Sequence, residues 1–194
     1  MRLIERVHQY LNQHLRPGDH AIDATAGNGH DTAHMASLVG AEGRIIAIDI
    51  QKEAITTTRK RLEAQNHLDR VQLLTGEHSK ILQSLCPTHA RTISAIVFNL
   101  GYLPGSDKSI QTTSKTTLRA LDASRKLLKP NGLLLVTAYR GHTGGQTEAD
   151  AVAQWMQSME SNWSIDIYDL KVKGDNTPPI LYAVRQFLAD DLRI

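Results

Sequence analysis

One unit recurs five times along this chain: a short apolar run, a loop and a longer amphipathic stretch. The apolar runs predict strands at residues 20–24, 44–48, 71–75, 93–98 and 133–138. The amphipathic stretches predict helices at residues 30–39, 52–65, 113–128 and 148–160, with a shorter helix that ends before Pro87. Strands that alternate with helices in this way predict a parallel sheet covered on both faces.

The two ends of the chain depart from this alternation. Residues 164–173 and 180–187 are two strand-like stretches without a helix between them, so the sheet should become antiparallel there. Near the N-terminus, apolar residues at helical spacing predict a helix within residues 1–16, which Pro17 and Gly18 end. No linker or repeat divides the chain, and we expect a single α/β domain over residues 1–194.

Composition excludes several classes of protein. With 22 Lys and Arg against 20 Asp and Glu, the net charge of +2 does not suggest a strongly basic nucleic-acid binder, although it permits a local basic face. The single cysteine, Cys86, has no partner for an intrachain disulfide and shows no metal-ligand spacing with the nine histidines. No signal peptide or bilayer-spanning apolar run is present, so we expect a cytoplasmic location, no membrane and no metal site.

A loop with two glycines follows the first predicted strand, in the stretch DATAGNGHDT of residues 23–32. Gly27 and Gly29 allow a tight turn and the close approach of a ligand, and the next helix points its first backbone amides into the same space. Twenty residues after Gly29, Asp49 ends the second strand, where a carboxylate suits the two hydroxyls of a ribose. The alternative is that the loop is only a tight turn capped by Asp31.

Two cofactors compete for this geometry. A dinucleotide site usually has a third glycine where this chain has Thr32. S-adenosylmethionine has no phosphate, and Asp23 and Asp31 on either side of the loop would attract its ammonium and sulfonium groups and repel a pyrophosphate. The sequence therefore favours S-adenosylmethionine. Its expected contacts are the loop residues Gly27, Gly29, Asp31 and Thr32 and the carboxylate of Asp49.

Two further polar residues lie near the ends of the predicted strands. Gln51 can reach the adenine or ribose edge of the cofactor, or it can be an ordinary residue of a first helical turn. His78 follows the third strand, where a polar side chain would lie over the adenine plane, although a solvated loop residue explains it equally well. For each residue both alternatives stay open.

The loop after the fourth strand begins with NLGYLPG, residues 99–105. The side-chain oxygen of Asn99 and a main-chain carbonyl can each accept a hydrogen bond from an amine, which turns the nitrogen lone pair toward a methyl donor. Tyr102 can stack on a flat ring. The alternative is a turn in which Asn99 bonds to local backbone and Tyr102 is simply packed.

The neighbouring loops carry charged and aromatic residues that face the same edge of the sheet. The residues that can meet a phosphate backbone are Lys108, Lys115, Arg140 and His142. Tyr139 can add a stacking surface. Solvated loop charges are the alternative for each charged residue taken singly.

The strings DATAGNGHDT, DIQKEAI, FNLGYLPGSDKSI, YRGHTGG and NTPPI together resemble one family of bacterial class I methyltransferases. That family was once labelled rRNA methylases and is typified by a tRNA 5-(aminomethyl)-2-thiouridine methyltransferase. The resemblance covers nearly the whole chain. It implies a Rossmann-like fold with a mostly parallel seven-stranded sheet, helices on both faces and an antiparallel C-terminal strand. It also implies a homodimer that transfers a methyl group from S-adenosylmethionine to the aminomethyl nitrogen of a wobble uridine in the anticodon loop of tRNA.

The resemblance also assigns residues by motif. It implies that the cofactor is bound by Asn28, Asp31, Asp49, Gln51 and His78. It implies that the methyl acceptor is bound by the loop of Asn99, Leu100, Gly101 and Tyr102. The better-known tetrad of amine methyltransferases is Asn-Pro-Pro-Tyr, so the two middle positions differ here. Without the prolines, a main-chain acceptor at Leu100 has less support than the Asn99 side chain.

The expected chemistry is direct attack of a neutral amine on the methyl group, with catalysis resting on positioning and no general base identified in the sequence. Three alternatives remain open. The first is a methyltransferase that acts on rRNA or on a small amine. The second is a nucleotide-dependent oxidoreductase, and the third is a module that binds cofactor and RNA without catalysis.

Overall fold

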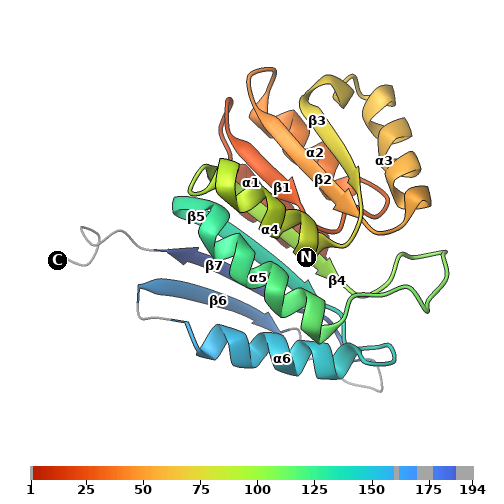
Figure 1. Ribbon diagram of the computed structural model, residues 1–194, viewed down its shortest axis with the longest axis vertical. Helices are drawn as coiled ribbons and strands as arrows, with labels where there is room; N and C mark the ends of the chain where they lie inside the picture. Colours follow the sequence, from red (N-terminus) through yellow and green to blue (C-terminus); the bar gives the residue numbers. More distant parts are fainter. Residues whose placement is uncertain (1, 160–161, 170–176, 187–194) are drawn as a thin grey trace.

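The computed structural model describes residues 2–159, 162–169 and 177–186, and it places a seven-stranded sheet between two layers of helices (Figure 1). The strands are β1 (His20–Asp23), β2 (Arg44–Asp49), β3 (Val71–Thr75), β4 (Ile93–Leu100), β5 (Leu128–Ala138), β6 (Trp163–Asp169) and β7 (Ile180–Gln186). The helices are α1 (Leu3–His14), α2 (His30–Val39), α3 (Lys52–Ala64), α4 (His78–His89), α5 (Ser114–Leu127) and α6 (Gly145–Gln157). A short 3₁₀ helix, η1 (Leu68–Arg70), precedes β3.

The strand order is β3-β2-β1-β4-β5-β7-β6. β1 pairs in parallel with β2 on one side and with β4 on the other, so the order in which strands are added reverses between β1 and β4. β7 runs antiparallel to both of its neighbours, β5 and β6. The expected mostly parallel sheet with an antiparallel C-terminal strand is confirmed. Of the predicted C-terminal strands, residues 170–173 and 187 lie outside the described part of the chain.

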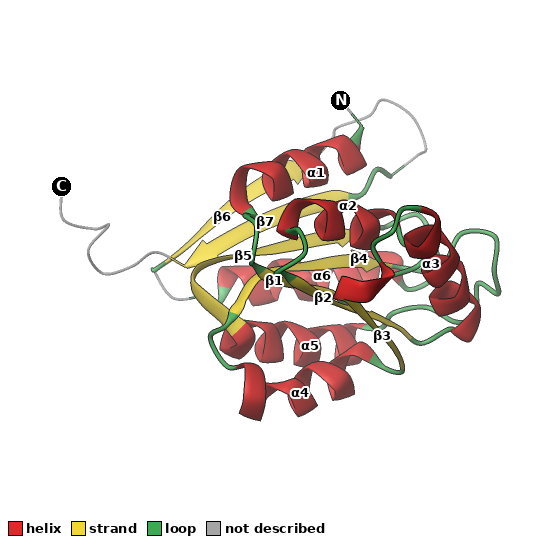
Figure 2. Cartoon of the chain, turned by 90° about the horizontal axis from the view of Figure 1, so that it is seen from above, coloured by secondary structure: helices red, strands yellow, loops and turns green. Residues whose placement is uncertain are grey.

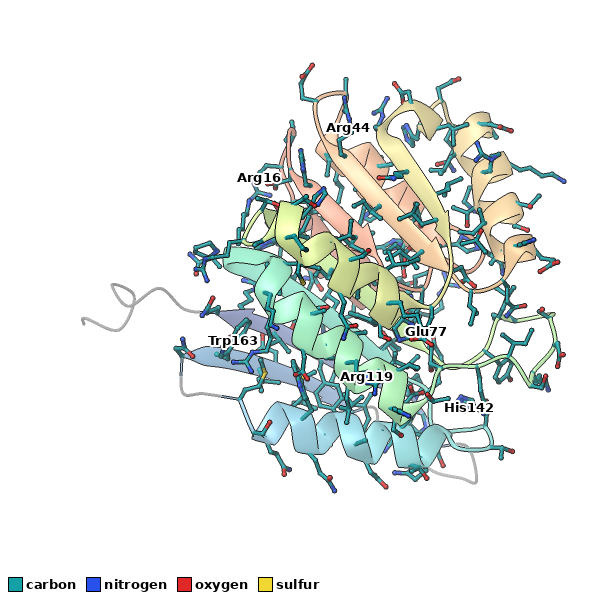
Figure 3. The ribbon with its side chains drawn as sticks, in the orientation of Figure 1. Arg16, Arg44, Glu77, Arg119, His142 and Trp163 are labelled. Atoms are coloured by element: carbon teal, nitrogen blue, oxygen red, sulfur yellow. The ribbon has the colours of Figure 1, made fainter. Side chains whose placement is uncertain are left out.

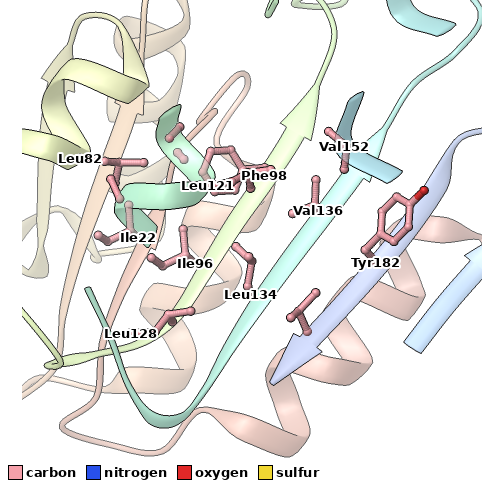
Figure 4. Close-up of a cluster of buried hydrophobic side chains, with 14 of the residues drawn as sticks. Ile22, Leu82, Ile96, Phe98, Leu121, Leu128, Leu134, Val136, Val152 and Tyr182 are labelled. Carbon is pink, nitrogen blue, oxygen red and sulfur yellow. The ribbon is translucent and has the colours of Figure 1, made fainter. Parts of the chain in front are cut away.

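Both faces of the inner strands are buried, because helices cover the sheet on each side, whereas the edge strands β3 and β6 are partly exposed. Figure 2 shows α1, α2 and α3 on one side of the sheet and α4, α5 and α6 on the other. The core under the first three helices includes Val7, Leu11, Ala21, Met35 and Leu62. The core under the other three helices includes Ile22, Leu82, Phe98, Leu121, Val136 and Val152 (Figure 4).

Several element boundaries differ from those predicted. β4 continues to Leu100 and β5 begins at Leu128, because the two strands stay paired across an irregularity in their register. α4 runs through Pro87 to His89, since a proline in the last turn removes only a hydrogen bond near the helix end. α6 begins at Gly145, three residues earlier than predicted.

Two kinds of feature are absent from the described part of the chain. None of its helices is long and apolar enough to cross a bilayer. Its His, Cys, Asp and Glu side chains form no group of three or more that could hold a metal ion.

Candidate functional site

A cavity of about 920 Å³ opens at the carboxyl ends of the parallel strands, at the point where the strand order reverses. Its walls come from α1, from the loops after β1 to β5 and from the start of α5. Figure 3 shows two lining residues, Glu77 and His142, on one side of the molecule, whereas Arg16 and Trp163 lie toward the opposite ends of the strands.

The glycine loop after β1 is held against α3. Gly27 has a φ of 52° and Gly29 a φ of 76°, in the left-handed region that favours glycine. The Gly27 carbonyl accepts a hydrogen bond from Thr58 Oγ1 at 3.1 Å, and the Asn28 carbonyl accepts one from Arg61 Nε at 2.7 Å. Gly27 and Asn28 line the cavity. Gly29 faces Thr58 instead: a Cβ there would lie 2.9 Å from Thr58 Cα, so glycine is needed for packing on α3.

Asp49 ends β2 in the wall of the cavity. Its Oδ2 accepts the backbone N–H of Gly27 at 2.9 Å, and its Oδ1 accepts that of Gln51 at 2.9 Å. Burial raises the pKa of the Asp49 carboxyl, and these backbone hydrogen bonds oppose the shift. Each oxygen keeps a further lone pair, so the carboxylate can still accept hydrogen bonds from two hydroxyl groups of a ligand.

His78 and Gln51 also line the cavity. His78 is 8% exposed, and its Nε2 is buried without a hydrogen-bond partner among the described residues. Burial lowers the pKa of its imidazole, which favours the neutral ring. The ring meets Phe98 edge-on, with the centroids 5.9 Å apart. Gln51 Oε1 accepts a hydrogen bond from Ser106 Oγ at 2.6 Å, which ties this residue to the loop after β4.

The structure does not bring Thr32 or Asp23 to the cavity. Thr32 is completely buried, and its Oγ1 donates to Asp23 Oδ2 at 2.6 Å. The backbone N–H of Thr25 donates to Asp23 Oδ1 at 3.3 Å. Burial, together with the nearby carboxylate of Asp31, raises the pKa of Asp23 to about 7. Because neighbouring helix residues differ by about 100° in direction, Thr32 points inward while Asp31 reaches the cavity.

Asp31, Asn99 and His8 form a hydrogen-bonded row beside the glycine loop. Asp31 Oδ2 accepts a hydrogen bond from Asn99 Nδ2 at 2.8 Å, and Asp31 Oδ1 lies 2.9 Å from His8 Nε2. The backbone N–H of Asn99 donates to Thr25 Oγ1 at 2.7 Å. Asp31 and Asn99 both line the cavity. The same cavity therefore contains residues predicted for the cofactor and the residue predicted for the acceptor.

The loop after β4 closes one side of the cavity. Tyr102 forms an isolated antiparallel bridge with Gln111 across this loop. The ring of Tyr102 lies 5.5 Å from that of His142, at an angle of 43°. Lys108 Nζ lies 5.5 Å from the centroid of the Tyr102 ring. Tyr139, which is 45% exposed, also lines the cavity, so this side offers aromatic surfaces and a nearby cation.

Two of the predicted substrate residues have other contacts. Leu100 is fully buried outside the cavity lining, and its carbonyl already accepts the backbone N–H of Tyr139 at 3.2 Å. Arg140 lines the cavity, but its guanidinium donates to the Pro178 carbonyl at 2.7 Å and to Asp169 Oδ1 at 2.9 Å. The two Arg140 contacts use guanidinium N–H groups that the sequence assigns to a phosphate.

α1 forms part of the cavity wall, which no motif in the sequence indicates. Its lining residues are Leu3, Ile4 and Val7. The apolar spacing predicts the helix, but the surface that it covers depends on how the folded chain packs. Gly101 lines the cavity as well, whereas Lys115 is exposed outside it.

The strand order, with β7 antiparallel beside parallel strands, and the cavity at the reversal point define the class I methyltransferase fold. An O-methyltransferase from Streptomyces achromogenes that is 11% identical has the same fold, with a TM-score of 0.72 over 95% of this chain and 79% of that chain. The chain belongs to the family described as "Putative rRNA methylase", whose sequence profile matches residues 45–185. The family identified from the motifs is thereby confirmed.

Three relatives are similar over much of the chain. A "tRNA (mnm(5)s(2)U34)-methyltransferase, chloroplastic" from Arabidopsis thaliana is 40% identical over 168 residues, which are 82% of this chain and 61% of that protein. A "putative rRNA-methylase" structure from Clostridium thermocellum is 34% identical, with a TM-score of 0.89 over 96% of this chain and 98% of that chain. A "putative methyltransferase" from Streptococcus mutans, in complex with SAH (S-adenosylhomocysteine), is 32% identical. Its TM-score is 0.83 over 96% of this chain and 99% of that chain. The chain thus spans less than two thirds of the curated plant relative.

Replacing Asp23 with Asn should change how stability depends on pH. The folded-state pKa of about 7 lies above the unfolded value of about 4, so the folded state holds this proton more tightly. The stability that Asp23 contributes is complete below about pH 4 and is lost as the pH rises through about 7. An Asn amide can accept from Thr25 and donate to Thr32 Oγ1, and it does not titrate.

Thermal unfolding of both proteins across this pH range tests the prediction. The wild type should lose stability relative to Asp23→Asn as the pH rises toward about 8. A difference in stability that stays constant with pH would contradict the raised pKa.

Proposed function

We propose that this protein is an S-adenosylmethionine-dependent N-methyltransferase that converts the 5-aminomethyl group of a wobble (2-thio)uridine in tRNA to 5-methylaminomethyl. The observation that carries the proposal is one cavity that contains Asp49 and His78, suited to a nucleoside, and Asn99, suited to an amine. The name of the Arabidopsis relative and the SAH in the Streptococcus structure support the reaction and the cofactor.

The cofactor half of the cavity fits S-adenosylmethionine. Asp49 has a free lone pair on each oxygen for the two ribose hydroxyls, and His78 has a buried Nε2 that needs a partner. Gly27 and Asn28 supply loop backbone that a ligand can approach closely. Asp31 provides a carboxylate for an ammonium group. When bound, S-adenosylmethionine supplies an activated methyl group.

The acceptor half fits an amine on a flat ring. The amide nitrogen of Asn99 donates a hydrogen bond to Asp31, so Asn99 Oδ1 remains to accept one from an N–H of the substrate. Tyr102 provides an aromatic face, and Lys108 and His142 lie beside it. We assign Gly101 to the wall of this half, and Tyr139, Arg140 and His142 to the rim that meets RNA. Leu100 supports the loop by packing, because its carbonyl is engaged by backbone.

The substrate amine must be unprotonated before it can accept a methyl group. An aminomethyl group is mostly protonated in neutral water, so one proton leaves to solvent for each methyl group gained. Transfer of the ammonium form into the cavity favours loss of this proton, because burial disfavours the charged form. Asn99 then holds the neutral amine in place, and catalysis rests on positioning.

The proposal extends to partner, assembly and location. The macromolecular partner is the anticodon loop of tRNA, the assembly is a homodimer and the compartment is the cytoplasm. The motif resemblance supports the first two, and the absence of disulfide-forming cysteine pairs supports the third. Sedimentation equilibrium of the purified protein distinguishes a monomer from a dimer.

A methyl-transfer assay tests the function. Labelled S-adenosylmethionine is mixed with bulk tRNA from cells that make the aminomethyl uridine but lack this protein, and the nucleosides are then analysed. Label in methylaminomethyl uridine is the expected result. Absence of label in tRNA, with cofactor binding intact, would reject the substrate and leave rRNA and small amines as the acceptors to examine.

The main effect of Asp49→Ala should be weaker binding of the cofactor. Loss of both carboxylate oxygens removes the acceptors for two hydroxyls, and we expect affinity for S-adenosylmethionine to fall roughly tenfold or more. Asp69→Ala is a matched control, because that side chain is 72% exposed and lies outside the cavity. Calorimetry measures both affinities, and unchanged binding by Asp49→Ala would refute the ribose contact.

Asn99→Ala should reduce turnover far more than cofactor binding. Removal of the acceptor that holds the amine should slow methyl transfer by about 100-fold, the usual scale for one oriented hydrogen bond at a reacting group. Single-turnover rates and calorimetric affinities give the two quantities separately. Equal losses in both would argue against an acceptor role for Asn99.

A further inference from the structure

α1 carries a histidine that contacts a carboxylate in the cavity wall. His8 Nε2 lies 2.9 Å from Asp31 Oδ1, and the His8 side chain is 27% exposed. The ring stacks on His34 of α2, with the centroids 3.8 Å apart and 9° between the planes, which fixes the plane of His8. One turn further along α1, Asn12 Oδ1 lies 2.9 Å from His34 Nε2. Two side-chain hydrogen bonds and one ring stack therefore join α1 to α2, and one of the hydrogen bonds ends on Asp31.

Asp31 determines how the side chain of Asn99 is turned. A carboxylate can only accept hydrogen bonds, so the Asn99 atom that lies 2.8 Å from Asp31 Oδ2 is the amide nitrogen. The opposite atom of that amide, Oδ1, is then the one left for an amine N–H. Turned by 180°, Asn99 would offer the amine two donors in place of an acceptor.

Asp31 lies near a second carboxyl group. The nearby carboxyl of Asp23 has its pKa raised toward neutrality, and repulsion by Asp31 is the second-largest cause after burial. Among the described residues, the side-chain hydrogen bonds of the Asp31 carboxylate are those with His8 and Asn99. Removal of His8 would leave the Asn99 amide as the side-chain hydrogen-bond donor to Asp31 among the described residues.

We infer that His8 is a positioning residue for methyl transfer: its Nε2 donates to Asp31, which holds the Asn99 amide with Oδ1 toward the substrate amine. The inference rests on the proposed function, since it takes an amine as the group that Asn99 accepts. His8 lies outside the lining of the cavity and acts through Asp31. His8 and Asp31 both precede residues 45–185, the stretch that the family profile matches.

Three substitutions separate this role from general support of α1. His8→Leu keeps apolar bulk and removes the donor, and it should lower the single-turnover rate about tenfold, the scale of one hydrogen bond to a charged group. His8→Gln restores an N–H donor of similar reach and should recover most of that rate. Asn12→Ala removes the other side-chain hydrogen bond between α1 and α2, does not touch the hydrogen bond of His8 to Asp31, and should keep the wild-type rate.

A double-mutant cycle gives the sharper measurement. If His8 acts by orienting Asn99, then His8→Leu should cost little further rate in an Asn99→Ala background. A residue that only stabilises the fold would lower the rate by the same factor in both backgrounds. Thermal melting and calorimetric binding of S-adenosylhomocysteine accompany every variant, so loss of folding or of cofactor is seen directly. Should His8→Leu not fold, the comparison of His8→Gln with His8→Met takes its place.

The outcomes distinguish this inference from the proposed function. A wild type that transfers no methyl group to tRNA overturns the proposed function and this inference with it. An active wild type with an equally active His8→Leu overturns the inference alone. The inference alone is also overturned if Asn12→Ala is as slow as His8→Leu, or if the losses from His8→Leu and Asn99→Ala simply multiply.

Discussion

The parallel pairing of β1 with both β2 and β4 determines where the cavity of this molecule lies. Parallel strands end at the same edge of a sheet, so the loops after β1, β2 and β4 are brought together although they are far apart in sequence. The helices that follow must pack on both faces, which leaves the space between these loops unfilled. The cavity of about 920 Å³ occupies that place, and Gly27, Asp49 and Asn99 each contribute from a different strand end.

The site keeps three carboxyl groups close together in largely buried surroundings, and each has its own donors. Asp49 accepts two backbone N–H groups, Asp31 accepts from Asn99 and lies against His8, and Asp23 accepts from a threonine hydroxyl. Burial raises the pKa of both Asp23 and Asp49. Of these three, Asp31 and Asp49 reach the cavity, so their carboxylates can meet a cationic or a hydroxylated ligand.

The sheet and much of the site could be predicted from the sequence, because strand alternation determines which residues stand at strand ends. The positions of Asp49 and Asn99 in the cavity wall follow from that alternation. Strand alternation does not say which way a side chain points within a helical turn, and Thr32, predicted for the cofactor, packs inward on Asp23. The sequence gives the Leu100 carbonyl less support as an acceptor than the Asn99 side chain, and in the structure this carbonyl accepts the backbone N–H of Tyr139, just after β5. His8 could not be found, since its contact with Asp31 spans 23 residues and depends on how α1 docks.

We propose that one cavity holds the cofactor at Asp49 and an amine at Asn99. A crystal structure with S-adenosylhomocysteine and an anticodon stem-loop that carries an aminomethyl wobble uridine would show both contacts at once. We expect the ribose hydroxyls on Asp49, the adenine beside His78, and the amine nitrogen within hydrogen-bond distance of Asn99 Oδ1. A ribose bound away from Asp49, or an amine that contacts neither Asn99 nor the loop after β4, would rule this arrangement out.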